Sequence, residues 1–337
     1  MPNHVMSYVF TLLGSVLLCV SLKLCIDGEH VDGIWARDEH ITEKVFECCD
    51  SNTSNSNPLS CNGSENLGII YFQRGLPFTG RGCECDRRLG QTSIHEREMY
   101  VWKPKQCHLS EWNSTLFCQL LSNRTVLMVG DSTMEQTSVT LISMITASRL
   151  STSCANQILF ARSDYLIWER FGKEKTWIQN LDLHHPDILI LNAGAWLQDE
   201  GDMETVLDSI TTEIKRRKQA SQRLPLLLWK SQSPGHRDCE KVQTPLTTSI
   251  ELAINRSNQV HKFNWHLHRA FDLQARKAIF SVNGSVLDVS PLYLRPDSHP
   301  GSNSTSGGDC LHYCIPGPLD LFSRLLLHEL VVTTGSY

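Results

Sequence analysis

The sequence predicts an α/β protein in which helices cover both faces of a parallel β-sheet. The first observation is that short apolar runs alternate along the chain with longer segments of helical periodicity. The second is that several of these runs end directly in small or polar residues, as buried parallel strands do before a loop. Strands that alternate with helical segments form βαβ units, so the sheet is expected to be parallel and covered on both sides.

The expected elements follow one another from residue 126 to the end of the chain. Strands are expected at 126–129, 158–160, 188–191, 226–229 and 286–289. Helices are expected near 134–150, near 203–223, as one long helix within 247–278, and at 319–331. Open α/β sheets bind ligands outside the carboxyl ends of their strands. The loops that directly follow strands should therefore converge on one rim, and they are 130–132, 192–194 and 231–235.

Composition and charge give no indication of a nucleic-acid partner. The chain has 337 residues, 41% hydrophobic and 20% charged, which are globular values, and its length allows one large domain or two. Its formal net charge is −5. The basic cluster Lys215–Lys218 lies in a helical segment, where a solvated helix face is the simpler interpretation.

The first 27 residues are expected to be a signal anchor or a signal peptide. Residues 5–26 are nearly all apolar and carry one charge, Lys23. No small-x-small cleavage site is obvious, so an uncleaved anchor is favoured. We then expect a single-pass type II protein, held in the membrane by this helix, with its main part in the Golgi or another lumen of the secretory pathway. Cleavage of the leader would instead give a secreted protein.

Glycosylation motifs and cysteines agree with a secretory location. Thirteen cysteines are many for a cytosolic protein of this size, so disulfides in an oxidising lumen are expected. Residues 28–115 form a cysteine-rich N-terminal segment, interpreted as a cap on the main domain at 116–337. The seven Asn-x-Ser/Thr acceptors for N-glycosylation are Asn52, Asn62, Asn113, Asn123, Asn255, Asn283 and Asn303.

Ser132 stands where an α/β enzyme places a nucleophile. The apolar run 126–129 leads into Gly130-Asp131-Ser132, and a helical segment follows. At such a turn the N–H groups and dipole of the helix N-terminus favour developing negative charge. Asp131 is expected to cap the turn through backbone N–H groups. A serine nucleophile further needs a base, a group that orients the base, and hydrogen-bond donors for the oxyanion.

His312 is the candidate base because a carboxylate and a constrained loop accompany it. Asp309 precedes it by three residues, close enough to turn back and hold the imidazole Nδ1–H while Nε2 faces a serine. Cys310 and Cys314 lie on the same loop, and a disulfide at either would hold the pair rigid. One alternative is a disulfide loop with an incidental histidine. The other is a zinc site built from Cys310, His312 and Cys314 with help from Asp297 and His299.

Two blocks of the sequence carry a resemblance to a known family. The first is Gly130-Asp131-Ser132, and the second is Asp309-x-x-His312 within the string DCLHYCIPGPLD. They resemble the Gly-Asp-Ser and Asp-x-x-His blocks of the PC-esterase domain in the SGNH/GDSL superfamily, and in particular of the trichome-birefringence-like polysaccharide O-acetyltransferases. Further similarities occur in the family's order, at Tyr100–Cys107, Asn192–Trp196, Ser233–Cys239 and Arg295–Pro300.

The resemblance implies a fold and a mechanism. The fold would be a three-layer α/β/α SGNH-hydrolase-like domain with a disulfide-bearing N-terminal cap. Ser132 would be the nucleophile, His312 its base and Asp309 the group that holds the base. The activity would be O-acetyl transfer to a glycan or polysaccharide through an acyl-enzyme. A carbohydrate acetyl esterase and a non-catalytic glycan-binding protein remain alternatives. Neither a bound cofactor nor a metal is implied, only an acetyl donor such as acetyl-CoA or an acetylated intermediate.

The resemblance also implies further site residues. The Ser132 backbone N–H and the Asn192 side-chain amide would stabilise the oxyanion. His299 would have a supporting role, with a role as the true base kept as an alternative. Glu135 departs from the family, because plant members carry Arg-Asn-Gln where this chain has Met134-Glu135-Gln136. Glu135 is therefore where substrate choice is expected to diverge. The full set assigned to oxyanion or substrate binding is Asn192, Gly194, Glu135, Gln136, Arg295, Asp297 and His299.

Overall fold

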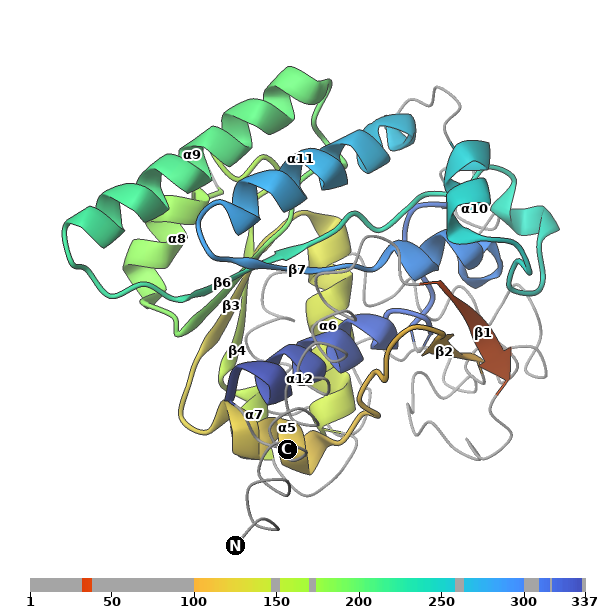
Figure 1. Cartoon of the computed structure of the whole chain (residues 1–337), viewed down its shortest axis with the longest axis horizontal. Helices are drawn as coiled ribbons and strands as arrows, with labels where there is room; N and C mark the ends of the chain where they lie inside the picture. The colour runs from red at the N-terminus through yellow and green to blue at the C-terminus, as the bar shows by residue number, and fades with distance from the viewer. Residues whose placement is uncertain are drawn as a thin grey trace, which may run out of the picture.

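A five-stranded parallel sheet forms the centre of the protein (Figure 1). The structure is a computed structural model that describes residues 32–37, 100–146, 152–169, 174–257, 264–299, 309–315 and 317–334. The strand order is β4-β3-β5-β6-β7, and every pairing is parallel. The strands are β3 (Val126–Gly130), β4 (Ile158–Arg162), β5 (Ile188–Leu191), β6 (Leu226–Lys230) and β7 (Ser285–Leu287). All five strands predicted from apolar runs are confirmed.

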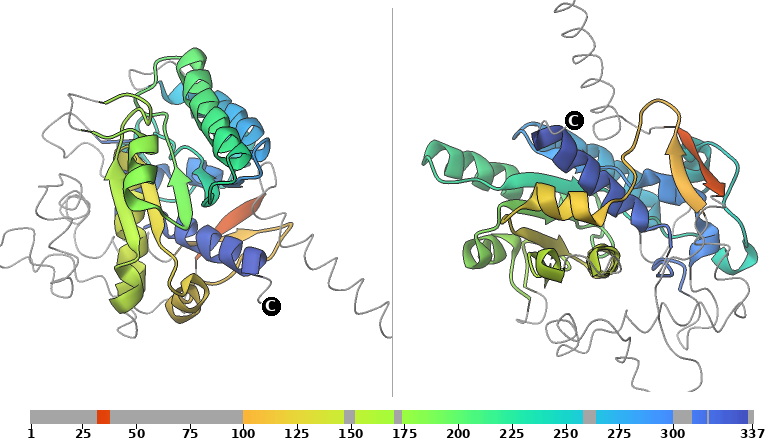
Figure 2. Two further views of the ribbon diagram at one scale, coloured as in Figure 1. Left: turned by 90° about the vertical axis from the view of Figure 1, so that its left-hand side faces the viewer. Right: turned by 90° about the horizontal axis from the view of Figure 1, so that it is seen from below.

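Helices cover both faces of this sheet, which confirms the three-layer arrangement (Figures 1 and 2). One face packs against α8 (Trp177–His184), α9 (Glu200–Gln219) and α11 (His268–Phe280). The other packs against α5 (Ser114–Leu121), α6 (Ser132–Thr146) and α12 (Asp320–Thr334). Side chains of β3 alternate between the two cores, because successive strand residues point to opposite faces. Leu127 and Val129 join the first core, and Val126 and Met128 join the second.

The single long helix expected within 247–278 is wrong, because two helices occupy that range. Helix α10 (Ile250–Ser257) is separated from α11, and a 3₁₀ turn, η3 (Trp265–Leu267), precedes α11. Asn264, just before this turn, has a left-handed φ of 54°. That conformation cannot continue a right-handed helix, so the chain must restart there. Helices α5 and α8 were not predicted from the sequence.

Two strands far apart in the sequence form a small antiparallel sheet at the end of the protein away from α9 (Figures 1 and 2). They are β1 (Gly33–Arg37) and β2 (Tyr100–Pro104). Trp35 in β1 lies against Trp102 in β2, and its indole N–H donates to the carbonyl of Pro291 at 2.9 Å. Pro291 belongs to a 3₁₀ turn, η4 (Ser290–Leu294), of the main domain. The described part of segment 28–115 therefore packs on the sheet domain.

Disulfides hold the domain at several places. One joins Cys118 in α5 to Cys154 in the short helix α7 (Thr152–Ala155). Another joins Cys239 to Cys310. Two further cysteines, Cys107 and Cys314, are also disulfide-bonded. Disulfides on the candidate histidine loop were expected from the sequence, and the bonds at Cys310 and Cys314 confirm them.

The glycosylation motifs that can be placed lie on the surface. Asn113, Asn123, Asn255 and Asn283 are all exposed. Asn113 caps α5, with its side-chain oxygen accepting from the Leu116 N–H at 2.9 Å. None of the helices in the described ranges combines the length and the hydropathy of a membrane span. The predicted leader at 1–27 and the motifs at Asn52, Asn62 and Asn303 lie outside the described residues.

Candidate active site

The turn between β3 and α6 presents Ser132 at the carboxyl edge of the sheet. Asp131 accepts hydrogen bonds at Oδ1 from the backbone N–H and the hydroxyl of Thr133, both at 2.8 Å. The predicted capping role of Asp131 is therefore confirmed. Gly130 precedes it, and a Cβ there would lie 2.8 Å from the Asn192 carbonyl oxygen and from Met134 Cβ. Only glycine lets the strand approach its neighbours this closely, so the turn before Ser132 needs this residue.

Ser132, His312 and Asp309 form one hydrogen-bonded chain. His312 Nε2 lies 2.9 Å from Ser132 Oγ. His312 Nδ1 lies 2.9 Å from Asp309 Oδ2 and 3.1 Å from its Oδ1. The carboxylate can only accept from Nδ1, so Nδ1 carries the proton and Nε2 is free to accept the serine proton. This order of groups is the one that a serine hydrolase or acyltransferase uses, so the geometry agrees with the roles predicted for Ser132, His312 and Asp309.

The loop that carries His312 is held from several directions. Asp309 Oδ1 also accepts from the backbone N–H groups of Leu311 and His312, at 3.2 and 3.0 Å. The Cys239–Cys310 disulfide and a hydrogen bond of 2.8 Å from the His236 N–H to the Cys310 carbonyl fix the residue next to Asp309. A base that must stay within hydrogen-bond reach of a nucleophile is served by such a rigid support.

Gln136 makes its hydrogen bonds to the loop that carries His312. The resemblance implies substrate binding for Gln136, but its side chain is buried and bonds the backbone of Tyr313 at both ends. Its Nε2 donates to the Tyr313 carbonyl and its Oε1 accepts from the Tyr313 N–H, both at 2.9 Å. Tyr313 follows His312, so Gln136 ties the base-bearing loop to the helix that begins with Ser132. One amide proton and one lone pair of Gln136 are therefore used by the protein itself.

Neither alternative for the histidine loop fits the structure. The zinc alternative needs thiolates, but Cys310 is bonded to Cys239 and Cys314 is also disulfide-bonded. Cys239, Glu240 and Cys310 do lie close together, yet both of those cysteines belong to the disulfide. The other alternative, a disulfide loop with an incidental histidine, does not fit because His312 contacts Ser132 directly.

His299 as the base fails on geometry. Its Nδ1 lies 2.6 Å from the His312 carbonyl oxygen, and its Nε2 lies 2.6 Å from His236 Nδ1. Both ring nitrogens are engaged there, and the contact with Ser132 is made by His312. The geometry therefore favours His312 over His299 as the base.

The two donors predicted for the oxyanion, the Ser132 N–H and the Asn192 amide, each have a proton without a partner among the described residues. The Ser132 N–H is the first of α6 and has no hydrogen-bond partner in the part of the chain that the structure describes. Asn192 follows β5, the neighbour of β3, and its Nδ2 donates one proton to the Lys230 carbonyl at 2.9 Å. An amide nitrogen has a second proton, which no described group accepts. Gly194 packs against Gln232, where a Cβ would overlap the glutamine side chain.

Glu135 lies one turn after Ser132 and is buried in a group of charges. Its Oε2 accepts from Arg162 Nη1 at 2.9 Å, and Arg162 Nε also donates to Asp164 Oδ1. Arg162 is the last residue of β4 and pairs with Gly130 in β3. Burial raises the pKa of Glu135 from 4.5 to about 7, although Arg162 opposes the shift. With 1% of its surface exposed, Glu135 faces Arg162 and not solvent. The sequence signalled neither Arg162 nor Asp164 as part of the site.

Arg295 and Asp297 form a buried ion pair. Two hydrogen bonds of 2.9 Å join the guanidinium to the two carboxylate oxygens, and both side chains are fully buried. The guanidinium also stacks over Trp35 and Tyr100, at 4.7 and 5.4 Å from the ring centroids. In this arrangement the pair joins the main domain to β1 and β2, and its contact with substrate stays a prediction.

Lys230, at the end of β6, is a buried cation that is not among the predicted site residues. Its Nζ donates to Ser233 Oγ at 2.9 Å and to the Ser231 carbonyl at 3.3 Å. Burial lowers its pKa to about 8. The sequence feature that could have identified Lys230 is a lysine at the carboxyl end of an apolar run.

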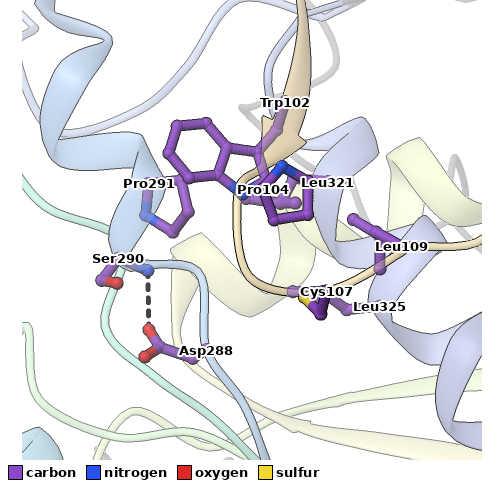
Figure 3. Close-up of a pocket in the computed structure, with 9 residues that line it drawn as sticks. All are labelled: Trp102, Pro104, Cys107, Leu109, Asp288, Ser290, Pro291, Leu321 and Leu325. Atoms are coloured by element: carbon purple, nitrogen blue, oxygen red, sulfur yellow. Dashed lines mark hydrogen bonds between the residues drawn. The ribbon is translucent and has the colours of Figure 1, made fainter. Parts of the chain in front are cut away.

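A small pocket elsewhere lies between β2, η4 and α12 (Figure 3). Its lining is mainly apolar and includes none of the three residues of the hydrogen-bonded chain around Ser132. The lining residues are Trp102, Pro104, Cys107, Leu109, Asp288, Ser290, Pro291, Leu321 and Leu325.

Glu135 is expected to make the stability of the protein depend on pH. A carboxyl whose folded pKa exceeds its unfolded value binds more protons in the folded state, so its contribution to stability becomes less favourable as pH rises. A rise from 4.5 to about 7 corresponds to roughly 3 kcal/mol. Relative to Glu135→Gln, the wild type is expected to lose stability between pH 4.5 and 7, as measured by denaturant unfolding across this range.

Glu213 provides the control for this prediction. Hydrogen bonds from Arg216 and then Arg217 lower its pKa to about 2, so its stabilising contribution is lost only as pH falls below 4.5. The difference between wild type and Glu213→Gln should therefore stay constant from pH 4.5 to 7. A constant difference for Glu135→Gln as well would contradict the raised pKa of Glu135.

Comparisons with known proteins agree with the resemblance seen in the sequence. Residues 197–329 match the PC-Esterase family, described as the GDSL/SGNH-like acyl-esterase family found in Pmr5 and Cas1p. Protein trichome birefringence-like 13 of Arabidopsis thaliana is 23% identical, over 97% of this chain and 98% of its own length. Xyloglucan O-acetyltransferase 1 of Populus trichocarpa is 23% identical, over 86% of both chains. Xyloglucan O-acetyltransferase 4 of the same plant is 21% identical, over 77% of both chains.

The predicted resemblance to the PC-esterase domain and to trichome-birefringence-like proteins is confirmed. The family match includes His312 but begins after Ser132. The similarity to the full-length relatives extends across most of the chain. At family level, these relatives support an acyltransferase or esterase that handles acetyl groups on glycans.

Proposed function

We propose that this protein is an O-acetyltransferase that moves an acetyl group onto hydroxyls of a glycan or polysaccharide through an acyl-enzyme on Ser132. The observation that carries the proposal is the hydrogen-bonded chain from Ser132 through His312 to Asp309 at the carboxyl edge of the sheet. Two relatives that are xyloglucan O-acetyltransferases by name support an acetyl group and a polysaccharide acceptor.

In the first half of the reaction, Ser132 Oγ attacks the carbonyl carbon of the acetyl donor while His312 Nε2 takes the serine proton. Asp309 holds Nδ1–H and stabilises the imidazolium. The Ser132 N–H and the free Asn192 amide proton donate to the oxyanion. The bond to the leaving group then breaks, and the leaving group receives the proton from His312. The acetyl group is now an ester of Ser132.

In the second half, a sugar hydroxyl attacks the same carbonyl carbon. His312 takes the hydroxyl proton and returns it to Ser132 Oγ as the acyl-enzyme bond breaks. Water at the same place would give hydrolysis, so acetyl transfer requires that the bound glycan exclude it. Transferase and esterase thus share all three residues and differ in what occupies the acceptor position.

The experiment is mass spectrometry of the protein, produced in a secretory pathway and treated with an acetyl ester. We expect an acetyl adduct on Ser132 and its transfer to one or more members of a glycan panel, with transfer faster than hydrolysis. Hydrolysis that added glycan leaves unchanged would instead indicate an esterase. A folded protein that binds glycan and never forms the adduct would overturn the enzymatic proposal.

We also propose that the reaction takes place in the lumen of the Golgi or another secretory compartment, with residues 1–27 as the membrane anchor or as a cleaved leader. The exposed positions of Asn113, Asn123, Asn255 and Asn283 and the disulfides support this location. In the same preparation, the mass of the protein should fall on enzymatic removal of N-glycans. A mass without any glycan contribution would count against a luminal location.

A further inference from the structure

Two buried histidines lie directly behind the candidate base. The carbonyl of His312 is 2.6 Å from Nδ1 of His299, and Nε2 of His299 is 2.6 Å from Nδ1 of His236. Nε2 of His236 in turn is 3.0 Å from the carbonyl of Tyr293. The two imidazoles therefore form a chain of three contacts between two backbone carbonyls, and one of these carbonyls belongs to the residue that contacts Ser132.

The protons of this chain can be counted. A carbonyl only accepts, so each of the three contacts needs one proton to be a hydrogen bond. Burial lowers the pKa of His236 to about 4 and also lowers that of His299, so both rings are neutral at neutral pH. Two neutral imidazoles hold two ring protons, one each. Two of the three contacts are therefore hydrogen bonds, and one is not.

The distances indicate which contact lacks the proton. A nitrogen lone pair facing a carbonyl oxygen is repulsive, and the cost is larger at 2.6 Å than at 3.0 Å. The short contact with the His312 carbonyl therefore carries a proton on His299 Nδ1. His299 Nε2 is then the acceptor, and His236 donates to it from Nδ1. The unprotonated nitrogen is His236 Nε2, which faces Tyr293.

We propose that His236 and His299 are positioning residues for the candidate base. His299 donates from Nδ1 to the His312 carbonyl, and His236 fixes the tautomer of His299 by donating to its Nε2. The pair acts on the backbone of His312 and touches neither substrate nor the reacting atoms. The inference rests on the proposed function, because the positioning concerns the imidazole that serves Ser132.

The backbone polar groups around His312 each have a hydrogen-bond partner, and His299 is the partner of the His312 carbonyl. Gln136 holds the N–H of the His312–Tyr313 peptide and the carbonyl of the next peptide, and Asp309 holds the His312 N–H. The bond from His299 completes this set on the carbonyl side. A misplacement of about 1 Å in a catalytic group can cost on the order of 100-fold in rate. Loss of the His299 bond is thus expected to lower kcat much more than it changes KM.

The test uses asparagine and glutamine, which place an amide at different ring positions. Asparagine puts its NH₂ group close to the site of Nδ1, and glutamine puts it close to the site of Nε2. His299→Asn keeps the donor to the His312 carbonyl, whereas His299→Gln moves it away. His236→Asn keeps the donor to His299, whereas His236→Gln leaves that contact empty. We expect each asparagine variant to retain kcat within about tenfold and each glutamine variant to lose roughly 100-fold.

His268 provides the matched control. It is also buried, and its ring nitrogens have no hydrogen-bond partner among the described residues. His268→Asn and His268→Gln should therefore have equal kcat once activity is normalised to the folded fraction. Equal kcat for the asparagine and glutamine variants at His299 or at His236 would overturn the proposal, and so would a change confined to KM.

A second measurement does not depend on activity. Nitrogen-15 NMR of the wild-type protein at neutral pH should find the ring proton of both His299 and His236 on Nδ1, with the signals assigned by the His299→Asn and His236→Asn variants. Protons on Nε2 of both rings would contradict the inference. Failure of the proposed function would appear separately, as a wild-type protein with these tautomers and no acetyl adduct on Ser132.

Discussion

Ser132→Ala is expected to lower kcat for acetyl transfer roughly 10⁴-fold or more and to abolish the acetyl adduct. The physical reason is that the substitution removes the oxygen that would form the acyl-enzyme, while the fold keeps its other contacts. Ser132 Oγ makes one described hydrogen bond, to His312 Nε2 at 2.9 Å, so stability should change little. Steady-state kinetics with a saturating acetyl donor and a glycan acceptor measure the effect.

Ser138→Ala is the matched control on the same helix. Ser138 is as buried as Ser132, and its hydroxyl donates to the Glu135 carbonyl at 2.8 Å. This variant should keep nearly the full rate. The double variant Ser132→Ala/His312→Ala should be no slower than Ser132→Ala alone, because groups that act as a unit are not additive. A Ser132→Ala protein that still transfers acetyl groups at the wild-type rate would remove Ser132 from the mechanism.

The sequence could predict the sheet because its signal is local. Four or five consecutive apolar residues define β3, and the Gly-Asp-Ser turn after it needs no distant partner. The pairing of Asp309 with His312 is local as well, since three residues separate them. The division of 247–278 into two helices escaped prediction because helical periodicity does not report the left-handed φ of Asn264.

The roles of Gln136 and Glu135 depended on partners far along the chain. Gln136 meets Tyr313, which is 177 residues away, and Glu135 meets Arg162 on another strand. No spacing rule connects such residues before the fold is known. Closeness to Ser132 in the sequence therefore indicates a contact with substrate for both residues. In the structure they support the base-bearing loop in one case and a buried charge group in the other.

Asp297→Asn is expected to destabilise the protein strongly, by about 3–5 kcal/mol. Arg295 and Asp297 are fully buried, so neutralising the carboxylate leaves a guanidinium without its counter-charge in the interior. The same guanidinium stacks on Trp35 of β1 and on Tyr100 of β2. Its displacement should also loosen these strands from the main domain. Denaturant unfolding measures the change in free energy, and kcat and KM of the folded fraction are measured in parallel.

Asp238→Asn is the control, because Asp238 forms an exposed ion pair with Lys241 at 2.8 Å. Surface pairs contribute little to stability, so this variant should unfold like the wild type. Asp238 has a left-handed φ of 52°, a conformation that asparagine also tolerates, so backbone strain should not confuse the comparison. If Asp297→Asn instead kept wild-type stability and raised KM, the pair would contact substrate, as the sequence resemblance implied. Loss of stability with unchanged KM in the folded fraction separates a structural ion pair from a substrate-binding one.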